Sequence, residues 1–175
     1  MGEARLSETK PSETKPSETK PSEAKLIGGS ESDRKKLLQL LDEYIVANHH
    51  IEWDELKHIW SELPEATFYN LNGHTYNGAD HWRKLWAFYK KNVQGSYWTP
   101  FDIGGAITDE MAVIWCHRDC YRNWVGKDTP PREIHYKGEK FFSRSTMVFH
   151  KEKGEWRVFH AHFSVGDSGP RPGGV

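Results

Sequence analysis

Two side chains with complementary acid–base chemistry stand close together in the segment 111–124. His117 and Asp119 are two positions apart, so both lie on one face of an extended strand. A carboxylate at that spacing can hold one ring nitrogen of the imidazole and raise the basicity of the other. The pair predicts a general base. A structural salt bridge at the open end of a sheet is the alternative interpretation.

A second candidate base lies in the strand-like segment 155–165. Strict alternation divides this segment into two faces. One face carries Trp156, Val158, His160, His162 and Ser164. The other, largely apolar face carries Arg157, Phe159, Ala161, Phe163 and Val165, and we expect it to line a core or cavity. His162 is a candidate general acid or base, although the polar face is equally consistent with an outer surface at a dimer interface.

Further residues are candidates for binding a substrate. Arg144 could clamp a carboxylate or enolate oxygen, or could instead pair with Asp119 or Asp102. Three tyrosine hydroxyls are candidate donors to an oxyanion: Tyr76, Tyr89 and Tyr97. Trp86 is a candidate substrate contact, with a position in the core as the alternative.

The sequence offers no recognised metal or cofactor motif. Cys116 and Cys120 are the only cysteines, and in a strand they lie about 13 Å apart, too far for a disulfide. Their spacing matches no standard zinc signature, so we expect buried free thiols and no metal. Glycine-rich phosphate loops, nucleophile elbows and dinucleotide fingerprints are also absent, so no cofactor is expected.

Charge and composition exclude several classes of partner. The net charge is −1, with 24 basic and 25 acidic residues, which favours neither nucleic acid nor a charged membrane surface. There is no 18-residue apolar run and no signal-peptide core after Met1. We therefore expect a soluble, cytoplasmic protein. Its eight Trp, eight Phe and seven Tyr can fill a core or line a cavity for a hydrophobic ligand.

The chain divides into a tail, one domain and a second short tail. A Ser-Glu-Thr-Lys-Pro repeat runs from Ser7 to Pro21, and its composition cannot bury a core, so residues 1–31 are predicted to be disordered. A tether is the simplest role for it, and a docking or phosphorylation segment is the alternative. Residues 32–165 form the predicted domain, and the glycine- and proline-rich residues 166–175 a flexible C-terminal tail.

Periodicity predicts an α+β domain in which helices close a curved antiparallel sheet. The first helix is capped by Ser32, runs to about Asn48 and carries an apolar stripe. The other predicted helices span 53–62 and 79–92. The predicted strands span 66–70, 75–76, 97–103, 111–124, 134–150 and 155–165. Three N-terminal helices and a curved sheet of this kind form a cone.

The order of elements resembles the nuclear-transport-factor-2-like (NTF2-like) fold. Two stretches carry the resemblance, Tyr69-Asn70-Leu71-Asn72-Gly73-His74-Thr75-Tyr76-Asn77-Gly78 and the hairpin from Val148 to Ser164. Within that superfamily the chain is similar to the SnoaL-like and calcium/calmodulin-kinase association-domain group. The resemblance covers residues 33–165 and implies a cone, but the fold hosts enzymes, hubs and binding modules alike.

Residue by residue, the resemblance transfers little. The kinase association domain places two arginines in a cavity that binds small carboxylates, and Phe163 and Met147 stand at those positions here. Metal-free carbonic anhydrases of the superfamily end in His-His-Ser-Ser, which is partly matched by Ala161-His162-Phe163-Ser164, so the resemblance implies carbonic anhydrase activity only as a minor alternative. SnoaL-like enzymes place a base on the first or second helix, and Asp54 is its counterpart here.

The leading functional hypothesis is a cofactor-independent isomerase, lyase or cyclase acting on a hydrophobic small molecule. His117 with Asp119, or His162, would be the base, and Arg144 or a tyrosine would stabilise the oxyanion. The alternative is a non-catalytic oligomerisation and ligand-binding module, tethered by the N-terminal repeat. Because the exposed sheet face of this fold commonly pairs, we expect a homodimer under either hypothesis.

Overall fold

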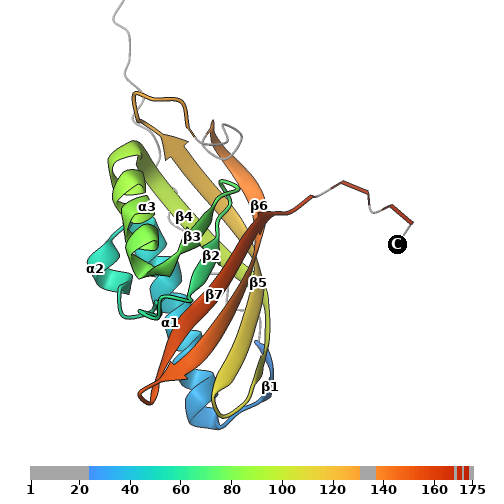
Figure 1. The fold of residues 1–175 in the computed structure, drawn as a ribbon. Coiled ribbons are helices and arrows are strands. Elements are labelled where there is room, and N and C mark those ends of the chain that lie inside the picture. Colours follow the sequence, from blue (N-terminus) through green and yellow to red (C-terminus); the bar gives the residue numbers. More distant parts are fainter. Residues whose placement is uncertain (1–23, 131–136, 168, 171, 174–175) are drawn as a thin grey trace, which may run out of the picture.

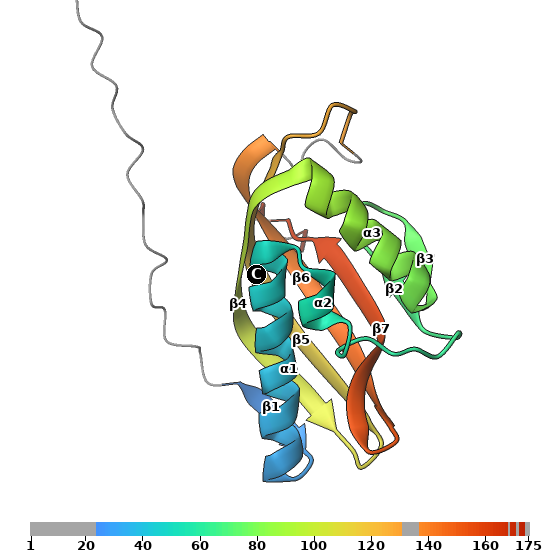
Figure 2. The same ribbon diagram turned by 90° about the vertical axis from the view of Figure 1, so that its left-hand side faces the viewer.

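A computed structural model describes residues 24–130, 137–167, 169–170 and 172–173. Seven strands form one curved sheet, and three helices pack against one of its faces (Figures 1 and 2). The strand order across the sheet is β1-β4-β5-β6-β7-β2-β3. The predicted α+β cone is confirmed, although two strand pairs, β1 with β4 and β2 with β7, are parallel.

Four long strands make up the centre of the sheet. They are β4 (Val93–Ile107), β5 (Met111–Trp124), β6 (Lys137–Glu152) and β7 (Glu155–Val165). All three neighbouring pairs are antiparallel. The edges are formed by short strands: β1 (Lys25–Gly28) on one side, and β2 (Thr67–Tyr69) with β3 (Thr75–Asn77) on the other. β5 and β7 have the predicted bounds, whereas predicted strand residues 134–136 lie outside the described residues.

The first helix, α1 (Glu31–His50), begins two residues earlier than predicted. Its N-cap is Ser30 rather than Ser32, because the Ser30 hydroxyl accepts the backbone N–H of Asp33 at 3.0 Å. The predicted apolar stripe is buried, including Leu37, Tyr44 and Asn48. Figure 2 shows α1 crossing the sheet, so this stripe forms the centre of the core.

The folded part of the chain also begins before residue 32. β1 lies within the segment assigned to the tail and pairs with Gly104–Ile107 of β4. Arg34 of α1 donates to the carbonyl of Gly28, which joins the end of β1 to the helix at 2.8 Å. The repeat itself, from Ser7 to Pro21, lies outside the described residues.

The second helix is shorter than predicted. α2 covers only Trp53–Leu56, whereas the sequence predicts a helix over 53–62. Two of the remaining residues bond to β7 instead: Val158 donates its N–H to the carbonyl of Ile59 at 2.7 Å, and Ser61 donates to the carbonyl of Val158 at 2.9 Å. This pairing buries Trp60 completely at the centre of the core.

The third helix, α3 (Gly78–Asn92), closes one end of the cone. It begins one residue before the predicted span of 79–92 and buries Trp82, Leu85, Trp86 and Tyr89. The β2–β3 hairpin lies beside it in both views (Figures 1 and 2). Among the described residues, no helix combines the length and apolar character needed to cross a membrane.

Candidate functional site

The alternation of β5 decides which of its side chains enter the cone. Its outward row contains His117 and Asp119, whereas the next residue in each case points inward. The inward row consists of Ala112, Ile114, Cys116, Arg118, Cys120 and Arg122, all buried. Two arginines therefore project into the apolar interior. Neither was among the residues singled out from the sequence.

Arg118 is fully buried between two aromatic rings. Its guanidinium carbon lies 4.3 Å from the ring centroid of Trp98 and 4.7 Å from that of Phe163. Nε donates to the Ser143 hydroxyl at 3.2 Å, while the contacts to the Tyr44 hydroxyl and the Arg144 carbonyl are long, at 3.5 Å. No carboxylate of the described residues forms a salt bridge with Arg118. A positive charge is thus held in the interior chiefly by cation–π contacts.

Arg122 lies two steps further along the inward row, with Cys120 between it and Arg118. Its guanidinium carbon is 4.6 Å from the Trp98 centroid and 4.7 Å from the Tyr89 centroid. Trp98 is therefore shared by both arginines. In a medium of low dielectric constant, two neighbouring cations favour the entry of an anion.

A small internal cavity adjoins Arg122. Its volume of about 10 Å³ leaves room for about one water molecule. Its walls are aromatic and amide side chains together with the arginine: Tyr44, Asn48, Asn70, Trp82, Leu85, Trp86, Tyr89, Trp98, Arg122 and Phe163. A larger ligand would require these side chains to move apart.

Tyr44 places a hydroxyl at this cavity. Burial raises its pKa above the usual value of 10, and the charge of Arg118 opposes that shift. The phenol is consequently neutral at physiological pH and can donate a hydrogen bond to a ligand. Asn48, one turn later, donates to the carbonyl of Tyr44 at 2.8 Å.

A network of hydroxyl and amide groups connects the cavity to the β2–β3 hairpin. The hydroxyl of Tyr89 accepts from Asn70 at 2.9 Å and from Asn72 at 3.4 Å. Asn72 also donates to the Tyr76 hydroxyl at 2.6 Å. Tyr76 and Tyr89 were both predicted to contact substrate, and the structure brings them together through Asn72.

The two thiols flank Arg118 on the inward row. Cys116 Sγ lies 3.1 Å from the Ser145 hydroxyl, and Cys120 Sγ lies 3.0 Å from that of Ser143. Burial raises the pKa of both, that of Cys120 to about 11. The prediction of buried free thiols is confirmed.

The predicted base His117 lies on the opposite, outer face of the sheet. Its Nδ1 is 3.2 Å from a carboxylate oxygen of Asp102, so this residue takes the part expected of Asp119. Arg144 is the cross-strand neighbour of His117 and donates to the carbonyl of Val165 at 3.3 Å. The rings of Phe101 and Phe142 pack on the imidazole, with centroid distances of 5.5 and 5.1 Å. These residues form an exposed cluster and do not reach the cone.

His162 also lies on the outer face, because a β-bulge interrupts the alternation of β7. Val148 pairs with His160 and Phe149 pairs with Val158, which leaves Phe159 without a position in the register. Trp156 and Val158 therefore face inward, contrary to the predicted grouping with His162. The exposed ring of Tyr69 contacts both imidazoles, at 4.9 Å from His160 and 5.7 Å from His162.

The remaining candidate residues are divided between interior and surface. Trp86 and Phe163 line the small cavity beside Arg122. Tyr97 stacks on Tyr121 at 5.3 Å on the outer side of the sheet. Asp54 is exposed and pairs with Lys57 at 3.0 Å, so it contributes nothing to the interior.

Known proteins of similar sequence or structure share this architecture. The sequence profile of the SnoaL-like domain matches residues 37–168. No curated protein matches the chain. Among solved structures, an NTF2-like superfamily protein from Salmonella enterica superposes with a TM-score of 0.66 at 14% identity, covering 81% of this chain and 96% of that one.

Two further structures are similar. An NTF2-like protein of unknown function from Pseudomonas putida has a TM-score of 0.65 and 14% identity, with 81% and 92% of the two chains covered. A provisionally assigned scytalone dehydratase from Novosphingobium aromaticivorans has a TM-score of 0.63 and 9% identity, with 78% and 85% covered. At these identities the similarity establishes the fold alone. Since the family profile spans most of the chain, the protein belongs to the SnoaL-like domain family.

Proposed function

We propose that this domain is a binding module for a small molecule that carries an anionic group and an apolar body. The observation that supports it best is the complete burial of Arg118 between Trp98 and Phe163, without a salt bridge to any described carboxylate. Burying a lone guanidinium costs several kcal/mol, more than cation–π contacts of about 2 kcal/mol return. An anion beside Arg122 would lower that cost for both arginines.

The chemistry of the interior favours binding over proton transfer. Within the described residues, no buried side chain is an Asp, a Glu or a His. Tyr44 is a neutral phenol and the two thiols are held protonated, so none of these groups is a base near neutral pH. The ligand-binding module is therefore the better supported of the two sequence-based hypotheses.

Matched carboxylates and amides test the proposal. Acetate and benzoate are compared with acetamide and benzamide by isothermal titration calorimetry, on the wild type and on Arg122→Met. We expect the carboxylates to bind at least tenfold more tightly than the amides, and Arg122→Met to abolish that preference. Equal binding of acid and amide by the wild type would contradict the proposal. Native mass spectrometry of protein from its own host adds the identity of any retained ligand.

An isomerase, lyase or cyclase remains a second proposal, supported by the provisional dehydratase assignment of one structural relative. Its predicted bases, His117 and His162, lie on the outer face, so a second subunit would have to cover them to exclude water. Deuterium exchange at the α-carbon of phenylacetone, followed by proton NMR, tests for such a base. Loss of exchange in His117→Asn would favour this second proposal. Exchange that is no faster with the wild-type protein than in buffer alone would exclude it.

A further inference from the structure

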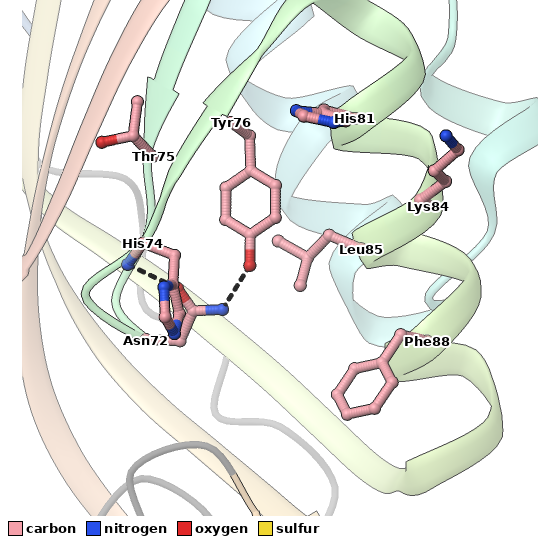
Figure 3. A pocket seen from close by; sticks show the side chains of 8 residues that line it. All are labelled: Asn72, His74, Thr75, Tyr76, His81, Lys84, Leu85 and Phe88. Atoms are coloured by element: carbon pink, nitrogen blue, oxygen red, sulfur yellow. Dashed lines mark hydrogen bonds between the residues drawn. The ribbon is translucent and has the colours of Figure 1, made fainter.

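An open groove lies between the β2–β3 hairpin and α3, outside the cone (Figure 3). Its volume is about 510 Å³, within the range of about 300–1,000 Å³ typical of small-molecule sites. The hairpin contributes Asn72, His74, Thr75 and Tyr76, and α3 contributes His81, Lys84, Leu85 and Phe88. We call this feature the hairpin groove. The α3 residues recur at helical spacing, so one side of the helix forms a continuous wall.

The charge of the hairpin groove has one sign. None of its eight lining residues is acidic, whereas Lys84, His74 and His81 carry or can carry a positive charge. The ring of Tyr76 and the side chains of Leu85 and Phe88 supply an apolar surface. Phe88 is 38% exposed, so its ring is accessible from the groove that it lines. Apolar walls with a positive rim are complementary to an amphiphilic anion.

The hydroxyl of Tyr76 supplies a directional group at the inner end of the groove. Figure 3 shows it pointing toward Asn72, whose Nδ2 donates to it at 2.6 Å. The phenol therefore acts as acceptor in that bond and keeps its own proton for another acceptor. No such acceptor is found among the described residues. Burial raises the pKa of Tyr76, while the Asn72 hydrogen bond opposes the shift, so the proton is retained at neutral pH.

We propose that the hairpin groove is a second binding site, for a small molecule with a ring-sized apolar body and one carboxylate-like group. Leu85 and Phe88 pack against the body, the Tyr76 hydroxyl donates to an anionic oxygen, and Lys84 supplies the charge at the rim. This site is distinct from the anion site proposed for the cone, because neither Arg118 nor Arg122 lines it.

Some residues contribute to both proposed sites, and only residues that belong to one of them can distinguish the two in a test. Leu85 lines both spaces, and Asn72 bonds to Tyr76 on one side and to Tyr89 on the other. Changing either residue would disturb both sites at once. Tyr76 and Lys84 line the groove alone, so they are the informative positions.

The probe is 2-naphthoate, with neutral 2-naphthamide as its match, titrated into the full chain and followed by calorimetry. The test variants are Tyr76→Phe and Lys84→Gln. Their controls are Tyr97→Phe, which removes a phenol on the outer side of the sheet, and Lys91→Gln, which removes an exposed lysine of α3 that does not line the groove. Urea unfolding of each variant establishes that it is folded.

We expect 2-naphthoate to bind at least tenfold more tightly than 2-naphthamide. Tyr76→Phe and Lys84→Gln should each weaken naphthoate binding about fivefold, the effect of one lost hydrogen bond or one exposed charge. Both controls should bind as the wild type does. Equal affinity for acid and amide would overturn the proposal, as would variants that match their controls. If Arg122→Met alone abolishes binding, the probe occupies the cone and the groove is not its site.

Discussion

The guanidinium carbon of Arg118 lies 4.7 Å from the centroid of the Phe163 ring, across the interior of the cone from one strand to another. Phe163 stands where the resemblance to the kinase association domain would require an arginine. In this chain β7 supplies the aromatic ring and β5 supplies the cation that rests on it. The interior thus keeps a positive charge although the arginine of the expected position is lost.

Replacement of Arg118 by Met is expected to raise the free energy of unfolding by about 1–3 kcal/mol. Met has a comparable length and fills the space between Trp98 and Phe163. The replacement also removes a buried positive charge, whose desolvation is unfavourable because no carboxylate among the described residues forms a salt bridge with it. Urea unfolding at pH 7 measures this free energy, and we expect the m value of the variant to equal that of the wild type. The same variant should lose its preference for benzoate over benzamide.

Arg144→Met serves as the matched control for that variant. Arg144 is exposed on the outer face, so its replacement should change stability by less than about 0.5 kcal/mol and leave benzoate binding unchanged. A loss of several kcal/mol in Arg118→Met, without any effect on carboxylate binding, would show that Arg118 has a purely structural role.

Most of the fold follows from local sequence patterns. The alternation in β5 and β7 gives their observed bounds, and the stripe of α1 gives its buried face. The errors occur where a distant partner decides. The predicted second helix stops at Leu56 because Ile59 and Ser61 bond to Val158 of β7. β1 was missed because its pairing with β4 joins residues about 80 positions apart.

The candidate site was harder to predict. His117 and Asp119 have the residue types and spacing of an acid–base pair, but their row on β5 faces outward. The signal for the inward row was nonetheless present: Ala112, Ile114, Cys116 and Cys120 belong to that row, and these small or apolar residues mark the buried face. Arg118 and Arg122 share that parity. For β7, the bulge at Phe159 could not be read from alternation, because one extra residue reverses every side chain beyond it.

Both thiols should be inert in the folded protein. Cys116 and Cys120 are buried, and burial holds the thiol pKa above its usual value, at about 11 for Cys120. Because the thiolate is the reactive form, Ellman's reagent at pH 7.5 should titrate fewer than about 0.1 thiols per chain without denaturant. In 6 M guanidinium chloride it should titrate both. Rapid reaction of either thiol in the native protein would contradict the buried placement.

Stability should decline in acid through Asp33. The Ser30 hydroxyl, Trp156 Nε1 and Lys151 all bond to this carboxylate and lower its pKa from 3.8 to about 2. A lowered pKa means that the stabilisation is complete above pH 3.8 and is lost as the pH falls toward 2. Since Asp33 is partly exposed, solvent screening reduces its contribution to about 1 kcal/mol.

Urea unfolding between pH 2 and pH 7 measures this contribution. Asp33→Asn should be less stable than the wild type at pH 7 and should approach it near pH 2. The exposed Asp54, paired only with Lys57, provides the control Asp54→Asn, for which we expect little change at any pH. A difference between Asp33→Asn and the wild type that stays constant with pH would exclude the ionised carboxylate as its cause.

The outer face of the sheet should mediate the expected homodimer. Trp115 and Met111 of β5 and Tyr69 of β2 are exposed there by 43%, 42% and 43%, and Trp115 shares a cross-strand row with Thr146 and His162. Large apolar side chains at such exposure on one face are typical of a protein interface.

Trp115→Glu should therefore raise the dimer dissociation constant about 30-fold or more, as expected for a central tryptophan. Sedimentation velocity over a concentration series measures this constant. Val46→Glu, at an equally exposed position on α1, should leave it unchanged. A wild-type chain that sediments as a monomer at all concentrations, or a Trp115→Glu variant that dimerises as the wild type does, would exclude this face as the dimer interface.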